Sequence, residues 1–349
     1  AGLFLHCMPK TIALYLAAIV LGSSLVWWVA NGRDDGQMAT EEVRFALRQS
    51  ADIGFSALRP LTRQDGLDTA QVALGRQLFS DTRLSKDGSI ACVSCHRFEQ
   101  GGADGLPRSF GVGGAEGVIN TPSVFNSDLN FVQFWDGRAG SLEEQVAGPL
   151  HNPLEMASSW AEVLPRLQAD AALRDAFAAV YPAGITAETV AHAVASFERS
   201  LRTPGAPFDR YLAGDASALS PLAQEGYEKF RDFGCISCHQ GVLLGGNMFQ
   251  KFGVMGDYFA SRKLQPADLG RYNVTGREED KHVFKVPSLR NVALTAPYFH
   301  DGSAAVLTEA IGVMGRFQLG RELASEDVGA IAAFRESLTG RLPESVEVP

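Results

Sequence analysis

The sequence has little cysteine, and almost all of it falls in two places. Four of the five cysteines form two Cys-x-x-Cys-His units, Cys92–His96 and Cys235–His239. The fifth, Cys7, stands directly before Met8, which suits a start codon, so we expect the preceding "AGLFLHC" to be a tag or an upstream extension. No cysteines are left over for a general disulfide framework.

Positive charge and strand-like patterns are also scarce. Lys and Arg number 31 against 40 Asp and Glu, and the net charge of −9 argues against a nucleic-acid partner, because phosphate binding needs clustered basic residues. Segments rich in Ala, Leu and Glu, broken by Gly and Pro, dominate the chain. The 46% hydrophobic content is normal for a protein with a sizeable core. We therefore predict a mainly helical protein of two or three domains with long loops.

A single long apolar run lies near the N-terminus. Residues 11–30, "TIALYLAAIVLGSSLVWWVA", carry no charge and as a helix would span about 30 Å, the thickness of a bilayer core. Lys10 precedes the run, and this weak positive bias predicts an N-terminus in the cytoplasm and a body outside it. Trp27 and Trp28 suit the outer membrane interface. The run predicts a membrane anchor.

A cleaved signal peptide is the alternative for the same segment. Gly22-x-Ser24 and Ala30-x-Gly32 both offer small residues in the spacing of a cleavage site, although the apolar core is long for that class. Either interpretation sends residues 40–349 to the periplasm.

After the N-terminal segment, the chain presents a similar pattern twice. Each half begins with a capped helix, at Asp68 with Gln71 and at Ser220 with Pro221, that leads to a Cys-x-x-Cys-His unit. Each half ends with an amphipathic helix. Their apolar faces hold Val190, Val194, Phe197 and Leu201 in the first half, and Val328, Ile331, Phe334 and Leu338 in the second.

The segment between the halves, "TPGAPFDRYLAGD", is rich in Pro and Gly and indicates a connection. We predict an N-terminal extension with the anchor or signal peptide, a tether with a lead-in helix, and two helical domains in tandem. Their ranges are 1–31, 32–65, 66–205 and 206–349.

The Cys-x-x-Cys-His units have the pattern that attaches c-type haem. Two thiols on one helical turn can bond to the two vinyl groups of one porphyrin, and the next residue places an imidazole beneath the iron. A redox-active cysteine pair needs no histidine and usually sits at a strand-to-helix junction. A zinc site would need all four thiols to converge, yet each pair begins its own helical domain. The sequence therefore favours two covalently bound haems, with His96 and His239 as iron ligands.

The two halves differ in the residues available for the sixth coordination position of each iron. Methionine is the usual partner of histidine in electron-transfer haem, and it raises the potential. The second half offers Met248, Met255 and Met314, and spacing favours Met314, which leaves the chain room to wrap the porphyrin. Any of the three could instead fill the core. Between His96 and the connection, the first half has only Met156.

Three further segments carry a resemblance to a known family. They are "FWDGRAGSLEEQ" (134–145), "GPLHNPLEM" (148–156) and "FKVPSLRNVALTAPYFHDGS" (284–303). Together with the two haem signatures they resemble the bacterial dihaem cytochrome c peroxidases, over nearly all of the chain after the N-terminal segment. In that family each domain is a cytochrome c fold, the first haem reduces hydrogen peroxide and the second receives electrons. The resemblance therefore implies two cytochrome c-type haem domains in tandem, a peroxidatic one at 66–205 and an electron-transfer one at 206–349.

The resemblance implies a role for several positions. Met314 matches the axial ligand of the electron-transfer haem, and Trp135 matches the tryptophan between the haems. His300 matches a position near the second haem whose role stays open. Residues on the peroxide side of the first haem are Gln145, Pro149 and Glu155, with Glu155 as acid/base, and those of a calcium site between the domains are Asn120, Thr295 and Pro297.

Residue chemistry agrees with the assignment of Glu155. Cleaving peroxide requires a proton to move to the leaving oxygen, and a carboxylate in an apolar pocket suits that transfer. The segment "HNPLEM" places one acid among Pro, Leu and Met. An average glutamate is a solvated surface residue, and a tryptophan such as Trp135 is usually core, so both roles depend on the motif context.

The family also implies partners for the protein, and two alternative functions have to be weighed against the peroxidase. A small donor protein (a cytochrome c or a cupredoxin) or a membrane quinol would deliver electrons, and a homodimer is expected. One rival function is a plain dihaem electron carrier, against which Glu155 argues. Another is the methylamine-utilisation dihaem enzyme, which oxidises residues on a partner protein and has tyrosine where Met314 stands here.

One loop departs from the family pattern. Many relatives carry a histidine between the first signature and the Asn-Thr-Pro segment, where it caps the first iron in the oxidised enzyme. Residues 97–119 here contain no His, Met, Cys or Lys. We expect a glycine-rich, mobile loop that leaves the first haem accessible. Nearby His151 is the remaining candidate ligand.

Overall fold

The computed structural model describes residues 58–343 and 346. The expected anchor or signal peptide at 11–30 and most of the tether lie outside the described residues. Among the residues that are described, we find no helix with the length and apolar character needed to cross a membrane.

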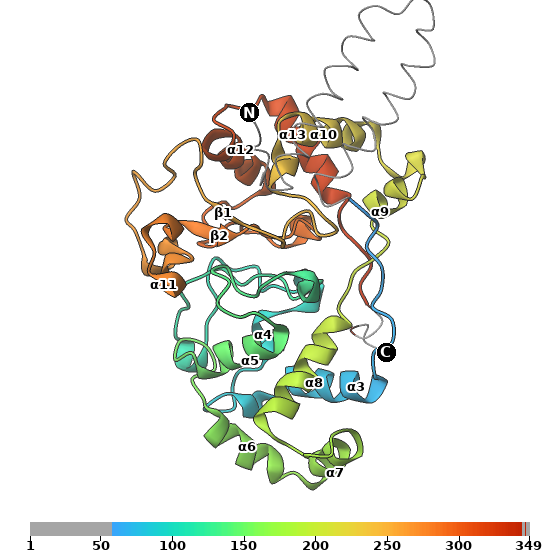
Figure 1. Ribbon diagram of the computed structural model, residues 1–349, viewed down its shortest axis with the longest axis vertical. Coiled ribbons are helices and arrows are strands. Elements are labelled where there is room, and N and C mark those ends of the chain that lie inside the picture. The colour runs from blue at the N-terminus through green and yellow to red at the C-terminus, as the bar shows by residue number, and fades with distance from the viewer. Residues whose placement is uncertain (1–57, 344–345, 347–349) are drawn as a thin grey trace, which may run out of the picture. The chain divides into compact units, whose positions relative to one another are not determined.

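The described chain is mainly helical, as predicted, and long loops connect the elements (Figure 1). The two strands, β1 (Phe249–Lys251) and β2 (Val283–Lys285), pair antiparallel with Phe249 opposite Lys285. The α-helices in chain order are α3 (Thr69–Phe79), α4 (Cys92–Cys95), α5 (Leu142–His151), α6 (Trp160–Gln168), α7 (Ala171–Val180), α8 (Ala187–Arg199), α9 (Pro207–Leu212), α10 (Pro221–Asp232), α11 (Tyr272–Thr275), α12 (Leu307–Gln318) and α13 (Ser325–Glu336).

The predicted helix starts are confirmed at both repeats. The Asp68 side chain accepts hydrogen bonds from the backbone N–H groups of Ala70 and Gln71 at the start of α3. Ser220 caps α10, and Pro221 occupies the first helical position, where its missing N–H costs nothing. Local sequence therefore sets where the first helix of each half begins.

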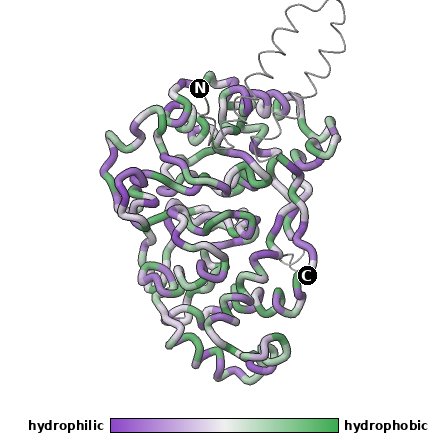
Figure 2. The backbone as a smooth tube through the Cα atoms, in the orientation of Figure 1, coloured by the Kyte–Doolittle hydropathy of each residue, from purple (hydrophilic) through white to green (hydrophobic). Residues whose placement is uncertain are grey.

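Two hydrophobic clusters form the cores. The first is built mainly on α3 and α5 to α8, and the second mainly on α9, α10, α12 and α13. Hydrophobic and hydrophilic stretches alternate along the helices, as one buried face requires (Figure 2). In each cluster the first helix packs against the last, α3 on α8 and α10 on α13.

A glycine permits each of these two helix crossings. A Cβ atom on Gly75 would lie 1.9 Å from the carbonyl oxygen of Ala193, and one on Gly226 would lie 1.9 Å from that of Ala330. The backbones are too close for any side chain at either place. The two halves thus repeat the same crossing, which supports the internal duplication inferred from sequence.

We expect Gly226→Ala to lower the free energy of unfolding by about 1–3 kcal/mol, the usual cost of overpacking. Gly329→Ala in α13 is the matched control, because nothing lies within 4 Å of its Cβ position. For this control we expect the free energy of unfolding to rise by about 0.5–1 kcal/mol, because alanine is the better helix former. Denaturant titration of both variants checks this, and equal stability would contradict the close crossing.

Thr203, a buried residue at the connection between the halves, bonds to one asparagine from each half. The Nδ2 groups of Asn126 and Asn291 each donate to Thr203 Oγ1 at 2.9 Å. Their Oδ1 atoms accept from the backbone N–H groups of Thr203 (2.8 Å) and Gly340 (3.0 Å), respectively. Asn126 and Asn291 have φ near 60°, a conformation that asparagine tolerates better than most residues. The two amides occupy corresponding places in the two halves.

Candidate functional site

The two signature histidines are prepared to bind a metal. His96 follows α4, and its Nδ1 donates to the carbonyl oxygen of Gly102 at 3.1 Å. His239 follows a 3₁₀ turn, and its Nδ1 donates to the carbonyl oxygen of Leu244 at 3.0 Å. These bonds leave each Nε2 as the ligand atom. Burial lowers the pKa of both imidazoles, that of His239 to about 4, so both are neutral as a metal ligand requires.

The four signature thiols are part-buried and free. Burial raises the pKa of Cys92 to about 12 and also raises the pKa of Cys95 and Cys235. Redox-active cysteines have lowered pKa values and sit in electropositive, exposed surroundings. The thiols therefore do not fit the redox-pair alternative, whereas attachment to a porphyrin needs only that they reach its edge.

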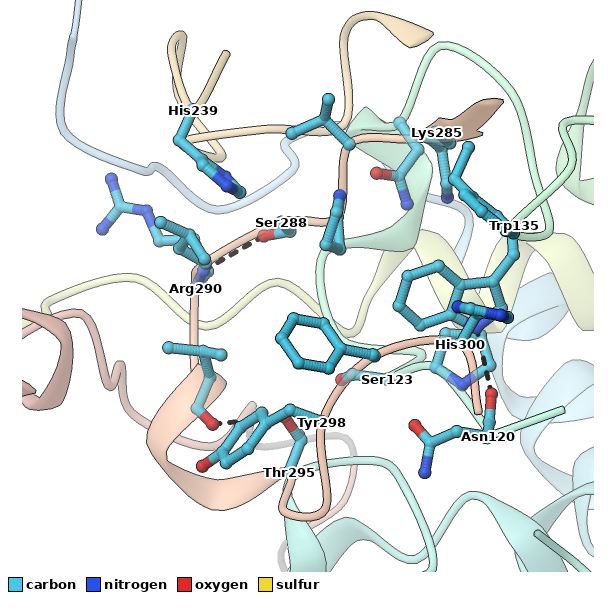
Figure 3. Close-up of a pocket in the computed structure, with 18 of the residues that line it drawn as sticks. Asn120, Ser123, Trp135, His239, Lys285, Ser288, Arg290, Thr295, Tyr298 and His300 are labelled. Carbon is cyan, nitrogen blue, oxygen red and sulfur yellow. Dashed lines mark hydrogen bonds between the residues drawn. The ribbon is translucent and has the colours of Figure 1, made fainter. Parts of the chain in front are cut away.

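One cavity of about 410 Å³ connects the two signatures. Its lining includes His96 and His239, and most of the remaining residues come from the loops that follow each signature. Figure 3 shows His239 in the same cavity as the Trp135 and His300 side chains. The residues present fit haem, because both signatures supply a neutral imidazole to one shared space, and the thiols of Cys235 and Cys238 line it as well.

Trp135 and His300 meet inside this cavity, with ring centroids 6.4 Å apart. Both follow a phenylalanine of positive φ in a short bridged loop, so they correspond to each other in the repeat. Trp135 Nε1 donates to the Asn120 carbonyl oxygen at 3.0 Å, and Asn120 N donates to the His300 carbonyl oxygen at 2.8 Å (Figure 3). The second of these bonds joins the two halves beside the contact between the two aromatic rings.

The His300 side chain has a partner that sequence analysis missed. His300 Nε2 lies 2.8 Å from Asp268 Oδ1, and both residues are buried. Asp268 lies in a turn between the strands, far along the chain from any motif, so no local signal pointed to it. Asp301 lies close to the same pair. The bond between His300 and Asp268 explains why these two side chains are close, without a metal ion between them.

The three methionines of the second half lie in different surroundings. Met314, in α12, lines the cavity with His239. Met255 is 63% exposed, and Met248 contacts the Gln240 side chain, with Sδ 4.0 Å from Nε2. Met314 is therefore the methionine that shares a space with the second signature histidine.

The first half has a proline where the second has this methionine. Helices α5 and α12 each follow one of the two bridged loops, and Pro149 in α5 occupies the place of Met314 in α12. Proline offers no ligand atom. Gln145, one turn earlier in α5, lines the cavity instead.

Glu155 lies just after α5 and is part-buried. Burial raises its pKa, opposed by a hydrogen bond of 2.6 Å from Asn152 Nδ2 and by the charge of Arg138. It does not line the shared cavity, but its charge acts on the Cys95 thiol, which places it beside the first signature. A carboxyl that keeps its proton more readily than usual is suited to proton transfer.

The glycine-rich loop is folded more closely than predicted. Residues 98–100 and 112–114 form 3₁₀ turns, and Phe110 pairs with Glu116. Val112 N donates to the Glu155 carbonyl oxygen at 2.8 Å, and a Cβ on Gly111 would lie 2.2 Å from the Leu154 carbonyl oxygen. The expectation of little structure was wrong, because the glycines allow close packing against the Glu155 segment. His151 is exposed, with its ring 6.3 Å from Trp160.

The residues predicted to bind calcium also line the cavity. Asn120 is buried, and its Nδ2 donates to the Leu106 carbonyl oxygen at 2.9 Å, so Oδ1 is the side-chain atom left for a cation. Thr295 and Pro297 lie close together in the loop after β2, with the Thr295 hydroxyl donating to the Val292 carbonyl oxygen. Oxygen donors of this kind suit calcium.

The chain is similar in sequence to known cytochrome c peroxidases. Residues 69–217 match the family model described as di-haem cytochrome c peroxidase. The cytochrome c peroxidase Ccp of Escherichia coli is 48% identical over 81% of this chain, which spans 61% of that relative's length. The cytochrome c551 peroxidase of Nitrosomonas europaea is 47% identical over 78% of this chain and 80% of its own.

The fold is also found in a solved structure, that of a MauG-like protein associated with microbial copper homeostasis. It is 30% identical, with a TM-score of 0.72, and covers 83% of this chain and 95% of its own. From the two haem signatures, the cavity that they share and the extent of these matches, we conclude that the chain belongs to the di-haem cytochrome c peroxidase family.

Proposed function

We propose that the protein reduces hydrogen peroxide to two waters, taking two electrons from a small donor protein or a membrane quinol and two protons from solvent. The observation that carries the proposal is the asymmetry of the repeat. Both halves hold a signature histidine, but only the second places a methionine in the corresponding helix, where the first has Pro149. Relatives at 47–48% identity bear the name of this activity.

The residues of the first half would handle the substrate and its protons. When bound, the haem held by Cys92, Cys95 and His96 would supply the iron centre at which electrons reach the peroxide. Glu155 would transfer a proton from one peroxide oxygen to the other. Gln145 lines the cavity and would orient the substrate by hydrogen bonding, and Pro149 would keep the adjacent space free of a competing side chain.

The second half would receive and pass on electrons. His239 and Met314 would be the protein ligands of the second haem iron. This ligand pair gives a high potential, so the haem would accept an electron readily. Trp135, in contact with His300, lies in the cavity shared by both signatures and would mediate transfer between the haems. We further propose that Asn120, Thr295 and Pro297 bind calcium, which would hold this contact together. A periplasmic location, a membrane tether and a homodimer complete the proposal.

The methylamine-utilisation activity is the second candidate. It is less well supported, because Met314 stands where that enzyme has tyrosine and the relatives named for that activity are only 33% identical.

The proposal is tested on the purified full-length protein. We expect a haemochrome assay to give two haems per chain that acid-acetone does not extract. We also expect peroxide to oxidise a reduced cytochrome c or cupredoxin with two electrons per peroxide. A single haem, or donor oxidation no faster than without the protein, would contradict it.

We expect the first haem to be accessible in the fully oxidised protein. Residues 97–119 hold no side chain that ligates haem iron well, and His151 is exposed beside Trp160. Electron paramagnetic resonance should give a high-spin first haem that binds cyanide without reductant. Two low-spin six-coordinate haems, with binding only after partial reduction, would refute this. In that case His151→Ala should restore cyanide binding.

A further inference from the structure

A buried carboxyl and a buried guanidinium stand at the same place in the two halves. Glu198 follows Phe197 in α8, and Arg335 follows Phe334 in α13. Each phenylalanine packs on a phenylalanine of the partner helix, at centroid distances of 5.3 Å in the first half and 5.2 Å in the second. The repeat therefore puts a carboxyl and a guanidinium at equivalent positions, and neither has a role in the peroxide chemistry proposed above.

Both side chains lack partners within the described protein. Glu198 is 5% exposed and Arg335 is 4% exposed. Among described residues, Glu198 Oε2 and Arg335 Nε are buried without a hydrogen-bond partner. Burial raises the pKa of the Glu198 carboxyl to about 8, whereas the Arg335 guanidinium is an unpaired buried charge, which is costly and normally has a partner. Both residues line the cavity that holds the signatures, so the haems that the signatures would bind are the groups that would come close to them.

The charge of each residue acts on the haem-binding residues of its own half. The Arg335 guanidinium contributes to lowering the pKa of His239 and opposes the rise in the pKa of Cys235. The Glu198 carboxylate contributes to raising the pKa of Cys92. Each group is thus near enough to influence the haem attached beside it.

We propose that Arg335 raises the reduction potential of the second haem, and that carboxyl-bearing Glu198 denies the first haem the same increase. Reduction adds an electron to the iron centre, and a nearby positive charge in a low-dielectric site stabilises the reduced state. The pair therefore separates the two potentials in addition to the Met314 ligand, and directs where the first electron resides. This inference rests on the proposed division of labour between the haems.

The test is a spectroscopic redox titration of the full-length protein with both haems bound, carried out without peroxide. Arg335→Gln should lower the midpoint of the second haem by at least a tenfold change in its reduction equilibrium, about 59 mV for one electron. Arg335→Lys should retain most of the wild-type potential because it keeps the charge. Arg316→Gln is the matched control, because Arg316 is an exposed arginine of the same half, paired with Glu322, and its removal should leave both midpoints unchanged.

The proposal is overturned by an unchanged midpoint potential of the second haem in Arg335→Gln. It is also overturned if this midpoint falls as far in Arg335→Lys as in Arg335→Gln. Should Arg335→Gln fail to take up both haems, Arg335→Met removes the charge without adding a polar atom and gives the same reading. Because no turnover is measured, a protein inactive toward peroxide still reports on Arg335. A wild-type protein without peroxidase activity would instead count against the proposed function.

Discussion

Glu155→Ala is expected to reduce peroxide turnover about 10²–10⁴-fold, the usual loss for a positioned acid/base. This corresponds to a barrier increase of roughly 3–5 kcal/mol. The physical reason is that the part-buried carboxyl beside Cys95 holds its proton more readily than an exposed glutamate and delivers it without solvent reorganisation. Steady-state kinetics with saturating donor, and spectra of both haems, provide the measurement.

Two further variants make this result specific. Glu155→Gln keeps the shape and the contact with Asn152 but cannot transfer a proton, so its rate should fall as far. Glu188→Ala removes an exposed carboxylate from the same half, and its rate should stay at the wild-type level. Full activity in either Glu155 variant would remove the residue from the mechanism.

Met314→Ala is expected to lower the midpoint potential of the second haem by on the order of 0.1 V or more, within the range of about 0.8 V that axial ligands span. Losing the thioether favours the oxidised iron, so the donor would no longer reduce this haem efficiently. The covalent attachment should survive, because Cys235 and Cys238 are unchanged. Redox titration and donor oxidation rates check both effects.

Met255→Ala is the control, because that side chain is mostly exposed and outside the shared cavity. Its potentials should equal those of the wild type. If Met255→Ala or Met248→Ala lowered the potential while Met314→Ala did not, the ligand assignment would be wrong.

Local sequence predicted the parts of the fold that local interactions decide. The caps at Asp68 and Ser220 depend on neighbouring residues, and both lie as predicted. Spacing and family resemblance together pointed to Met314, which lines the cavity. The anchor at 11–30 stays a prediction.

Other features depend on contacts between distant residues, so no local pattern contained them. The Asp268 partner of His300 comes from a turn that reaches the site only in the folded chain. The glycines of the loop before Asn120 suggested freedom, but Gly111 is needed for a close approach to the Leu154–Glu155 backbone. Glu198 and Arg335 are buried and line the cavity, a placement that depends on how the repeated helix crossings arrange distant segments.

The threonine shared by Asn126 and Asn291 has a consequence for how the protein could be divided. Because Thr203 precedes the second half in the chain but bonds to both amides, a fragment starting at residue 206 would bury the Asn291 amide without that partner. A lost partner of this kind costs roughly 1–3 kcal/mol, a large part of the stability of a small domain. Although the two halves repeat one pattern, they are not interchangeable modules, and any truncation or graft of the second half should carry the Thr203 segment with it.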